Sequence, residues 1–181
     1  MRVIGIDPGN AVTGFGVVER RSELHHIAVG TIRGGLRRGP QRLASLYQRL
    51  LDVIDEHAPQ AMSLERSFVA LNVRSAFTLG EARAIAMLAA AHRGLELFEY
   101  NPTDVKLSIA GYGRAGKEQV KQMVRRTLRL DDQFELTDDA ADALAIALCH
   151  VFRAKVPRPL PAPSTWRARA LSDAAGGRGR P

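Results

Sequence analysis

The first sixty residues combine short apolar runs with one longer periodic segment. Residues 2–7 (R-V-I-G-I-D) form an apolar run that ends on an aspartate, which predicts a buried strand. Largely apolar stretches at 15–19 and 24–32 follow the glycine-containing loop 8–14, an order typical of an antiparallel meander. Residues 41–57 repeat apolar side chains at helical spacing, so an amphipathic helix is expected there.

The rest of the chain alternates between strand and helix before it ends in helices. The expected elements are a strand at 61–65, a helix at 75–92, a strand at 95–100, a helix opening with N-P-T-D near Val105, and helices at 117–130 and 138–153. This order predicts a mixed five-stranded α/β sheet with helices on both faces. The helix at 75–92 is rich in alanine, so another helix could approach it closely, and Phe77 within it is expected in the core.

The composition is that of a globular domain with an appended tail. Of the 181 residues, 45% are apolar and 25% charged, which excludes general disorder. Cys149 is the single cysteine, which excludes a disulfide scaffold, and we expect it to be an inert buried residue. We predict one domain over 1–155 and a Pro-rich, basic, disordered tail at 156–181.

The sequence contains no signal for a membrane. No apolar run approaches the roughly 20 residues that span a bilayer. Asp7 interrupts the N-terminal apolar run, which argues against a signal peptide. We therefore expect a cytoplasmic protein without a membrane partner.

The net charge of +7 is unevenly distributed. Residues 153–181 hold seven Lys or Arg and one Asp, so the rest of the chain is close to neutral. Within that part, 101–130 carries seven basic and two acidic groups, whereas 131–142 carries six acidic groups and no basic one. A basic segment that leads into an acidic cluster is more informative than the total charge.

Acidic residues occupy strand ends and the start of the last helix. Asp7 and Glu65 each end a predicted strand, and Asp139 and Asp142 are three apart on one helix face. Asp138 is also spaced to share a face with Asp142, so spacing leaves the choice between Asp138 and Asp139 open. Taken singly, a turn at Asp7, a salt bridge at Glu65 and a helix cap at the aspartate pair explain these residues as well as a functional site does. Together they would repel one another unless a cation offset them, and an all-oxygen set suits Mg²⁺ or Mn²⁺ for phosphodiester hydrolysis.

Ordered motifs throughout residues 2–152 resemble one known family. They are G-I-D-P-G-N-A-V-T-G-F-G at 5–16, L-E-R-S-F at 64–68, N-V-R-S-A-F-T-L-G-E-A-R at 72–83, D-V-K at 104–106, G-K-E-Q-V-K-Q-M-V at 116–124 and D-A-A-D-A-L-A-I-A at 139–147. The chain resembles the RuvC-type Holliday junction resolvases, members of the retroviral-integrase and ribonuclease H-like superfamily. The resemblance implies a ribonuclease H-like fold.

The resemblance also implies the site residues. It assigns two Mg²⁺ ions per active site, or Mn²⁺, to the catalytic carboxylates Asp7, Glu65, Asp139 and Asp142, and so favours Asp139 over Asp138.

The resemblance further implies that positively charged and aromatic residues contact the DNA. Lys106 and Lys117 fall on catalytic positions near the scissile phosphate, and Phe68 falls on an aromatic that unstacks bases in the junction. Without the resemblance, solvated lysines and a core phenylalanine would fit as well. Arg114 lies in the glycine-rich segment 111–117 and is a candidate DNA phosphate contact.

Three positions depart from the family pattern. Arg66 and Glu81 stand where glutamine is common, and Leu71 stands where a basic residue is frequent. These departures affect the expected sequence preference and leave the carboxylate set intact.

The implied function is resolution of four-way DNA junctions in homologous recombination and DNA repair, leaving 5′-phosphate and 3′-hydroxyl ends. Symmetric incision implies a homodimer, which we expect to form through the helix at 75–92. The family also implies cooperation with a branch-migration complex of a junction-binding tetramer and a hexameric ATPase. The alternatives are a nuclease for structured RNA, a non-catalytic junction binder and, with least support, an actin-like ATPase.

Overall fold

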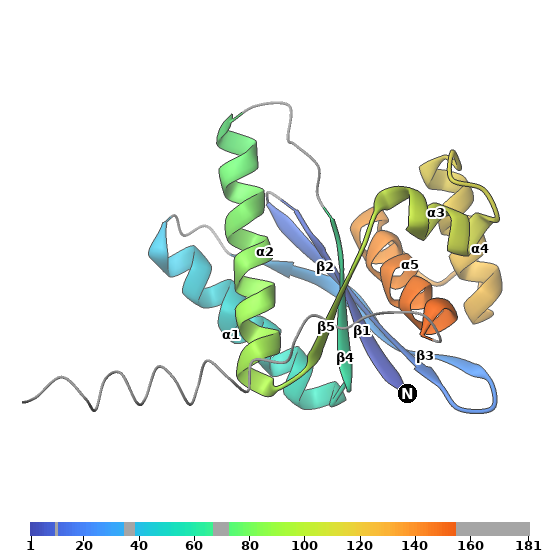
Figure 1. The fold of residues 1–181 in the computed structure, drawn as a ribbon, viewed down its shortest axis with the longest axis horizontal. Helices are drawn as coiled ribbons and strands as arrows, with labels where there is room; N and C mark the ends of the chain where they lie inside the picture. Colours follow the sequence, from blue (N-terminus) through green and yellow to red (C-terminus); the bar gives the residue numbers. More distant parts are fainter. Residues whose placement is uncertain (10, 35–38, 67–72, 155–181) are drawn as a thin grey trace, which may run out of the picture.

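A five-stranded sheet organises the described part of the chain (Figure 1). The computed structural model describes residues 1–9, 11–34, 39–66 and 73–154. The strand order is β3-β2-β1-β4-β5. The strands are β1 (Arg2–Pro8), β2 (Val12–Arg20), β3 (Leu24–Arg33), β4 (Ala61–Glu65) and β5 (Glu96–Tyr100).

The sheet is mixed, as the sequence predicts. Strands β1, β2 and β3 form the antiparallel meander, whereas β4 and β5 are parallel to β1. The loop expected over 8–14 is shorter than predicted, because β2 already begins at Val12 and Thr13 pairs with Pro8. Parallel pairing brings the carboxyl ends of β1 and β4 to the same edge of the sheet.

Helices cover both faces of the sheet (Figure 1). On one face lie α1 (Pro40–His57) and α2 (Val73–Arg93), and on the other lie α3 (Pro102–Ala110), α4 (Lys117–Leu128) and α5 (Asp138–Arg153). Each of these helices in the described part of the chain occurs where the sequence predicts one. Among the described residues, no helix is both long enough and apolar enough to cross a membrane.

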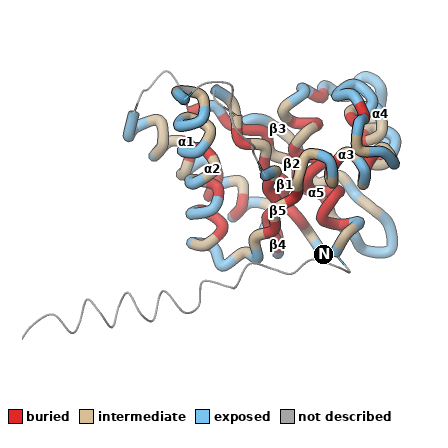
Figure 2. Tube along the Cα trace, turned by 45° about the horizontal axis from the view of Figure 1, so that its top comes forward, coloured by how far each residue is buried: buried red, intermediate tan, exposed pale blue. Residues whose placement is uncertain are grey.

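The two faces of the sheet have separate apolar cores. Helix α5 is almost wholly buried, and Figure 2 shows it as a largely red tube beside the sheet. Cys149 is fully buried on this helix, as expected, and burial raises the pKa of its thiol to about 11. His150 is also buried, where the Tyr100 hydroxyl lies 2.8 Å from its Nδ1. Helix α5 is therefore a buried, central element of the fold.

The prediction that Phe77 belongs to the core is wrong. Its side chain is 72% exposed on α2. Val73 and Leu88 on the same helix are also largely exposed, whereas Ala82 and Ala86 face the sheet. The sequence pattern could not separate the two apolar faces of this helix. The prediction of one domain over 1–155 stays a prediction, and the tail at 156–181 lies outside the described residues.

Candidate active site

Asp7 and Glu65 point to the same face of the sheet because of the strand pleat. On β1, Ile4 and Ile6 pack into the core beneath α1 and α2. Because side chains alternate along a strand, Asp7, the residue after Ile6, points to the opposite face. On β4, the hydroxyl of Ser63 donates a hydrogen bond to the carbonyl of Ile146 on α5, at 3.2 Å. Glu65 lies two residues further along the strand and therefore also faces the α5 side.

Glycines in β1 and β2 let α5 pack unusually close to the sheet. A Cβ atom at Gly5 or at Gly14 would lie 2.1 Å from a backbone oxygen of α5, which at Gly14 is the oxygen of Asp139. Gly14 is also the cross-strand partner of Asp7. The close approach brings the first turns of α5, with Asp139 and Asp142, beside Asp7. This role of the glycines was not predicted from the sequence, although their positions on one face of adjacent strands were the available signal.

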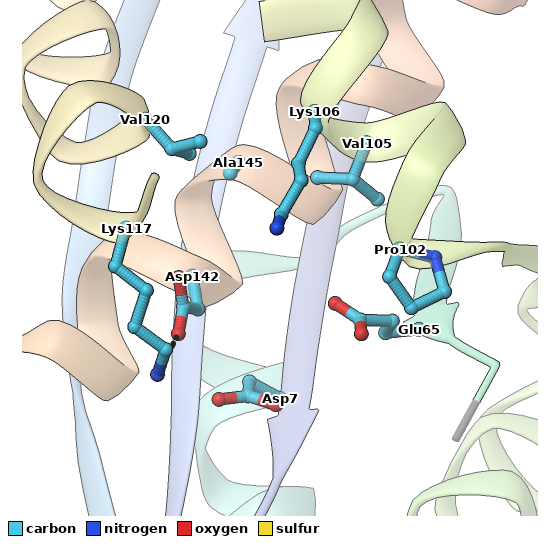
Figure 3. Close-up of a pocket in the computed structure, with 9 residues that line it drawn as sticks. All are labelled: Asp7, Glu65, Pro102, Val105, Lys106, Lys117, Val120, Asp142 and Ala145. Atoms are coloured by element: carbon cyan, nitrogen blue, oxygen red, sulfur yellow. Dashed lines mark hydrogen bonds and ion pairs between the residues drawn. The ribbon is translucent and has the colours of Figure 1, made fainter. Parts of the chain in front are cut away.

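A cavity of about 290 Å³ opens where β1, β4, α3, α4 and α5 meet. The carboxylates of Asp7, Glu65 and Asp142 and the ammonium groups of Lys106 and Lys117 point into this space (Figure 3). Five of the sequence-predicted site residues therefore line one cavity. Apolar side chains from α3, α4 and α5 complete its walls.

Burial and repulsion oppose ionisation of the carboxylates. Burial raises the pKa of Asp7 to about 7, with further contributions from the negative charges of Asp142, Glu65 and Asp139. Burial and the Asp142 carboxylate also raise the pKa of Glu65. Lys117 has a raised pKa because Asp142 stabilises its ammonium group. The cavity therefore favours binding of a cation.

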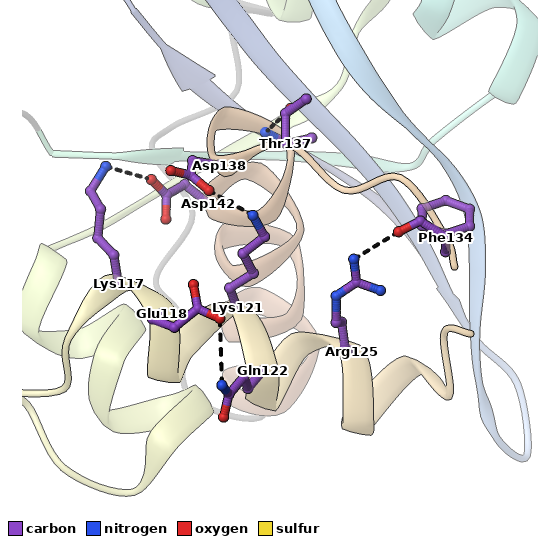
Figure 4. A network of polar contacts seen from close by, with 10 residues as sticks. Lys117, Glu118, Lys121, Gln122, Arg125, Phe134, Thr137, Asp138 and Asp142 are labelled. Carbon is purple, nitrogen blue, oxygen red and sulfur yellow. Dashed lines mark hydrogen bonds and ion pairs between the residues drawn. The ribbon is translucent and has the colours of Figure 1, made fainter. Parts of the chain in front are cut away.

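Two lysine–aspartate pairs join α4 to α5 (Figure 4). Lys117 Nζ lies 3.2 Å from Asp142 Oδ2, and Lys121 Nζ lies 2.7 Å from Asp138 Oδ1. Asp138 is exposed and its pKa is lowered by the hydrogen bond from Lys121. Asp139, by contrast, is half-buried and raises the pKa of Asp7 through its charge. This arrangement favours Asp139 as the residue that faces the site, although it does not line the cavity itself.

Thr137 fixes the start of α5. Its Oγ1 accepts a hydrogen bond from the backbone N–H of Ala140, at 3.4 Å. The acidic first turn of α5 also lies where the helix dipole favours negative charge. Thr137, and not an aspartate, therefore caps α5, while Asp138 and Asp139 in the first turn are placed where the helix dipole favours their charge.

The remaining predicted contacts lie apart from the cavity or outside the described residues. Arg114 is exposed in the connection between α3 and α4 and does not line the cavity. Phe68 and Leu71 fall outside the described residues. Both other departures from the family pattern make ion pairs, Glu81 with Arg42 at 2.7 Å and Arg66 with Glu99 at 3.8 Å.

Comparison with known proteins identifies the family. A sequence model of the family described as crossover junction endodeoxyribonuclease RuvC matches residues 3–150. The chain belongs to the RuvC family. The RuvC protein of Trichlorobacter lovleyi is 45% identical over 153 residues, covering 83% of this chain and 85% of that protein. The RuvC protein of Alkalilimnicola ehrlichii is 46% identical over 154 residues, covering 84% of this chain and 92% of that protein.

The solved structures agree with this assignment. Thermus thermophilus RuvC in complex with Holliday junction substrate matches with a TM-score of 0.78 and 33% identity. The match covers 88% of this chain and 99% of that one. These findings confirm the predicted ribonuclease H-like fold and the predicted class, a crossover junction endodeoxyribonuclease.

RuvC nucleases depend on divalent metal ions. The carboxylate oxygens gathered at the cavity have the donor chemistry that hard divalent cations prefer. Within the described ranges, no three His, Cys, Asp or Glu side chains lie close enough together to hold one ion. The cation that Asp142 contacts is instead the ammonium group of Lys117. The residues thus fit a divalent cation in charge and in donor type. Their carboxylates line the same cavity but do not converge on one point.

Proposed function

We propose that this chain resolves four-way DNA junctions by symmetric hydrolysis of phosphodiester bonds. The observation that carries the proposal is the cavity in which Asp7, Glu65 and Asp142 meet Lys106 and Lys117. Phosphodiester hydrolysis requires both cation-binding carboxylates and positive charge near the reacting phosphate. The products are 5′-phosphate and 3′-hydroxyl ends, and the reaction belongs to homologous recombination and DNA repair.

The cofactor in this proposal is Mg²⁺, which Mn²⁺ can replace, with two ions in each active site. The ligands are Asp7, Glu65, Asp139 and Asp142. When bound, such ions polarise the scissile phosphate and lower the pKa of a water molecule. The protein holds the four carboxylates in a partly buried place where, without cations, burial and repulsion keep the pKa of Asp7 near 7.

Two lysines carry the positive charge on the protein side. Lys106 reaches the cavity from α3 and Lys117 from the first turn of α4. In the proposed mechanism both contact the phosphate that is cut and stabilise the negative charge that develops on its oxygens. Figure 3 shows both ammonium groups directed toward the space that the carboxylates line, which supports this role.

Phe68 and Arg114 are proposed DNA contacts away from the reacting phosphate. Stacking of a base on an exposed aromatic is worth about 1–3 kcal/mol, enough to hold a junction open beside the site. Arg114 is exposed on the α3–α4 connection and can reach a backbone phosphate without entering the cavity.

A homodimer through α2 is the proposed assembly. A four-way junction has two-fold symmetry, so two symmetric incisions require two active sites. The outward face of α2 exposes Val73, Phe77, Met87 and Leu88, which are 73%, 72%, 36% and 50% exposed. A second copy of the same helix would cover this apolar face in an isologous contact.

The cellular setting rests on the family resemblance alone. The dimer works with a branch-migration complex of a junction-binding tetramer and a hexameric ATPase. The dimer acts in the cytoplasm, where its DNA substrate is also found.

Incision of a synthetic mobile four-way junction tests the proposal. Linear duplex of the same sequence is the control substrate, and each is incubated with Mg²⁺, Mn²⁺ or EDTA. Paired symmetric nicks on the junction, lost in EDTA, are expected. Tight junction binding without nicks in either ion would favour a binding protein, and cleavage of structured RNA with indifference to junctions would favour an RNA nuclease.

A further inference from the structure

Arg83 on α2 reaches the end of β4 from the face opposite the cavity. Its Nη1 donates a hydrogen bond to the backbone carbonyl of Glu65, at 2.8 Å. Glu65 is the last residue of β4. Arg83 therefore holds the strand at the residue whose side chain enters the cavity.

A largely shielded carboxylate holds Arg83 in place. Nη2 of Arg83 forms an ion pair with Glu99 on β5, and the two side chains are only 22% and 14% exposed. Glu99 lies beside Leu64 in the β4–β5 register, so the pair lies directly next to the strand end. Arg66 adds a second, longer contact to Glu99 at 3.8 Å. A planar guanidinium with two fixed partners has little freedom to reorient.

The backbone on the other side of the strand end is also paired. The N–H of Arg66 donates to the carbonyl of Tyr100 at 2.7 Å, which extends the β4–β5 pairing past Glu65. Arg83 thus supplies a contact from α2, and β5 supplies one from the sheet. Arg83 does not line the cavity, and its charge is not among the causes of the pKa shift of Glu65.

We propose that Arg83, held by Glu99, is a positioning residue for Glu65. It fixes the backbone from which the Glu65 side chain projects, and so fixes the direction of a proposed metal ligand. This inference rests on the proposed function of the cavity. Groups that orient metal ligands without touching the ion typically change metal affinity or activity about 10–100-fold when removed.

The experiment compares Arg83→Met with Arg93→Met in the full-length protein. Arg93 is the last residue of the same helix and pairs with Asp55 at 2.6 Å. Its loss therefore removes one ion pair of the helix without removing the contact to the Glu65 carbonyl. Mn²⁺ binding without DNA, followed by electron paramagnetic resonance, is the readout independent of cleavage. Arg83→Met should weaken Mn²⁺ binding about tenfold and raise the Mg²⁺ concentration needed for half-maximal cutting by a similar factor. Arg93→Met should leave both within about twofold.

Two milder variants keep the test decisive if Arg83→Met does not fold. Arg83→Lys keeps one donor and the charge and should lose part of the Mn²⁺ affinity, whereas Glu99→Gln should loosen Arg83 and give a smaller loss in the same direction. Wild-type Mn²⁺ affinity and Mg²⁺ dependence in every folded Arg83 and Glu99 variant would overturn the inference. A wild-type protein that does not cut junctions would instead overturn the proposed function.

Discussion

Lys117 Nζ lies 3.2 Å from Asp142 Oδ2, so a cation already contacts a carboxylate of the cavity. A lysine in the first turn of a helix opposes the helix dipole, and the contact with Asp142 offsets that cost. The carboxylate is also a proposed metal ligand, and the lysine a proposed phosphate contact. Binding of metal and substrate would therefore separate this pair.

Lys117→Met should bind divalent metal more tightly and cut more slowly. The substitution removes the cation that competes at Asp142, but it also removes positive charge from the phosphate. Since 75% of the lysine side chain is exposed, the pair is screened. A gain in Mn²⁺ affinity of about two- to fivefold is expected, in line with exposed ion pairs. Lys121→Met, which breaks the neighbouring pair with Asp138, is the control, and equal Mn²⁺ affinities in the two variants would contradict the account.

The stability of the metal-free protein should fall as pH rises toward neutral. Asp7 ionises at pH 3.8 in its ordinary state but near pH 7 when folded, so the folded state keeps a proton that the unfolded chain releases. The stabilisation from that proton is fully present below the pKa of the unfolded state, 3.8, and is lost as pH rises through the pKa of the folded state, about 7.

Asp7→Asn should remove the part of this pH dependence that Asp7 contributes, while the raised pKa of Glu65 leaves a remainder. Urea unfolding in EDTA, from about pH 4 to about pH 8, should show wild type losing about 1–3 kcal/mol more than the variant. Asp55→Asn is the control, because Arg93 lowers the pKa of that exposed carboxyl and so gives the opposite sign. Identical pH dependence in wild type and Asp7→Asn would show that Asp7 is not held in its protonated form.

Gly14→Ala should displace the start of α5 and impair cutting. The added Cβ would lie 2.1 Å from the backbone oxygen of Asp139. Because the overlap is with backbone, no change of a side-chain rotamer can relieve it. A loss of stability of about 1–3 kcal/mol is expected from such overpacking, with weaker Mn²⁺ binding in the folded fraction. Gly116→Ala is the control, since a Cβ there meets nothing within 4 Å. Equal urea midpoints for the two variants would mean that α5 does not need the glycine.

Phe77→Glu should separate the proposed dimer. A charge in the centre of the apolar face on α2 would have to be buried without a partner. Sedimentation should show monomers, and paired symmetric nicks should give way to single ones. Phe152→Glu, at a phenylalanine that is 41% exposed on α5, is the matched control. A dimer that survives Phe77→Glu would place the assembly elsewhere.

The elements and the carboxylate set could be predicted because they are local properties of the sequence. Short apolar runs, turn residues and helical spacing predicted each strand and helix that the described residues form, and strand-end positions drew attention to Asp7 and Glu65. The motifs also led to the RuvC family, which the comparisons confirm.

The supports of the site could not be predicted, because they depend on how elements pack. The need for Gly14 arises only where α5 crosses β2, and the role of Arg83 only where α2 passes the end of β4. Phe77 was misassigned for the same reason, since a helix with apolar residues on two faces does not reveal which face meets the sheet.

The most direct test of the carboxylate cavity as the hydrolytic centre is the cutting of a four-way junction by Asp7→Asn. The substitution keeps the size of the side chain and removes one proposed metal ligand. Cutting in Mg²⁺ should fall by at least about a thousandfold, while junction binding in EDTA stays within about twofold of wild type. Cutting at the wild-type rate, or loss of junction binding in a folded variant, would contradict the account.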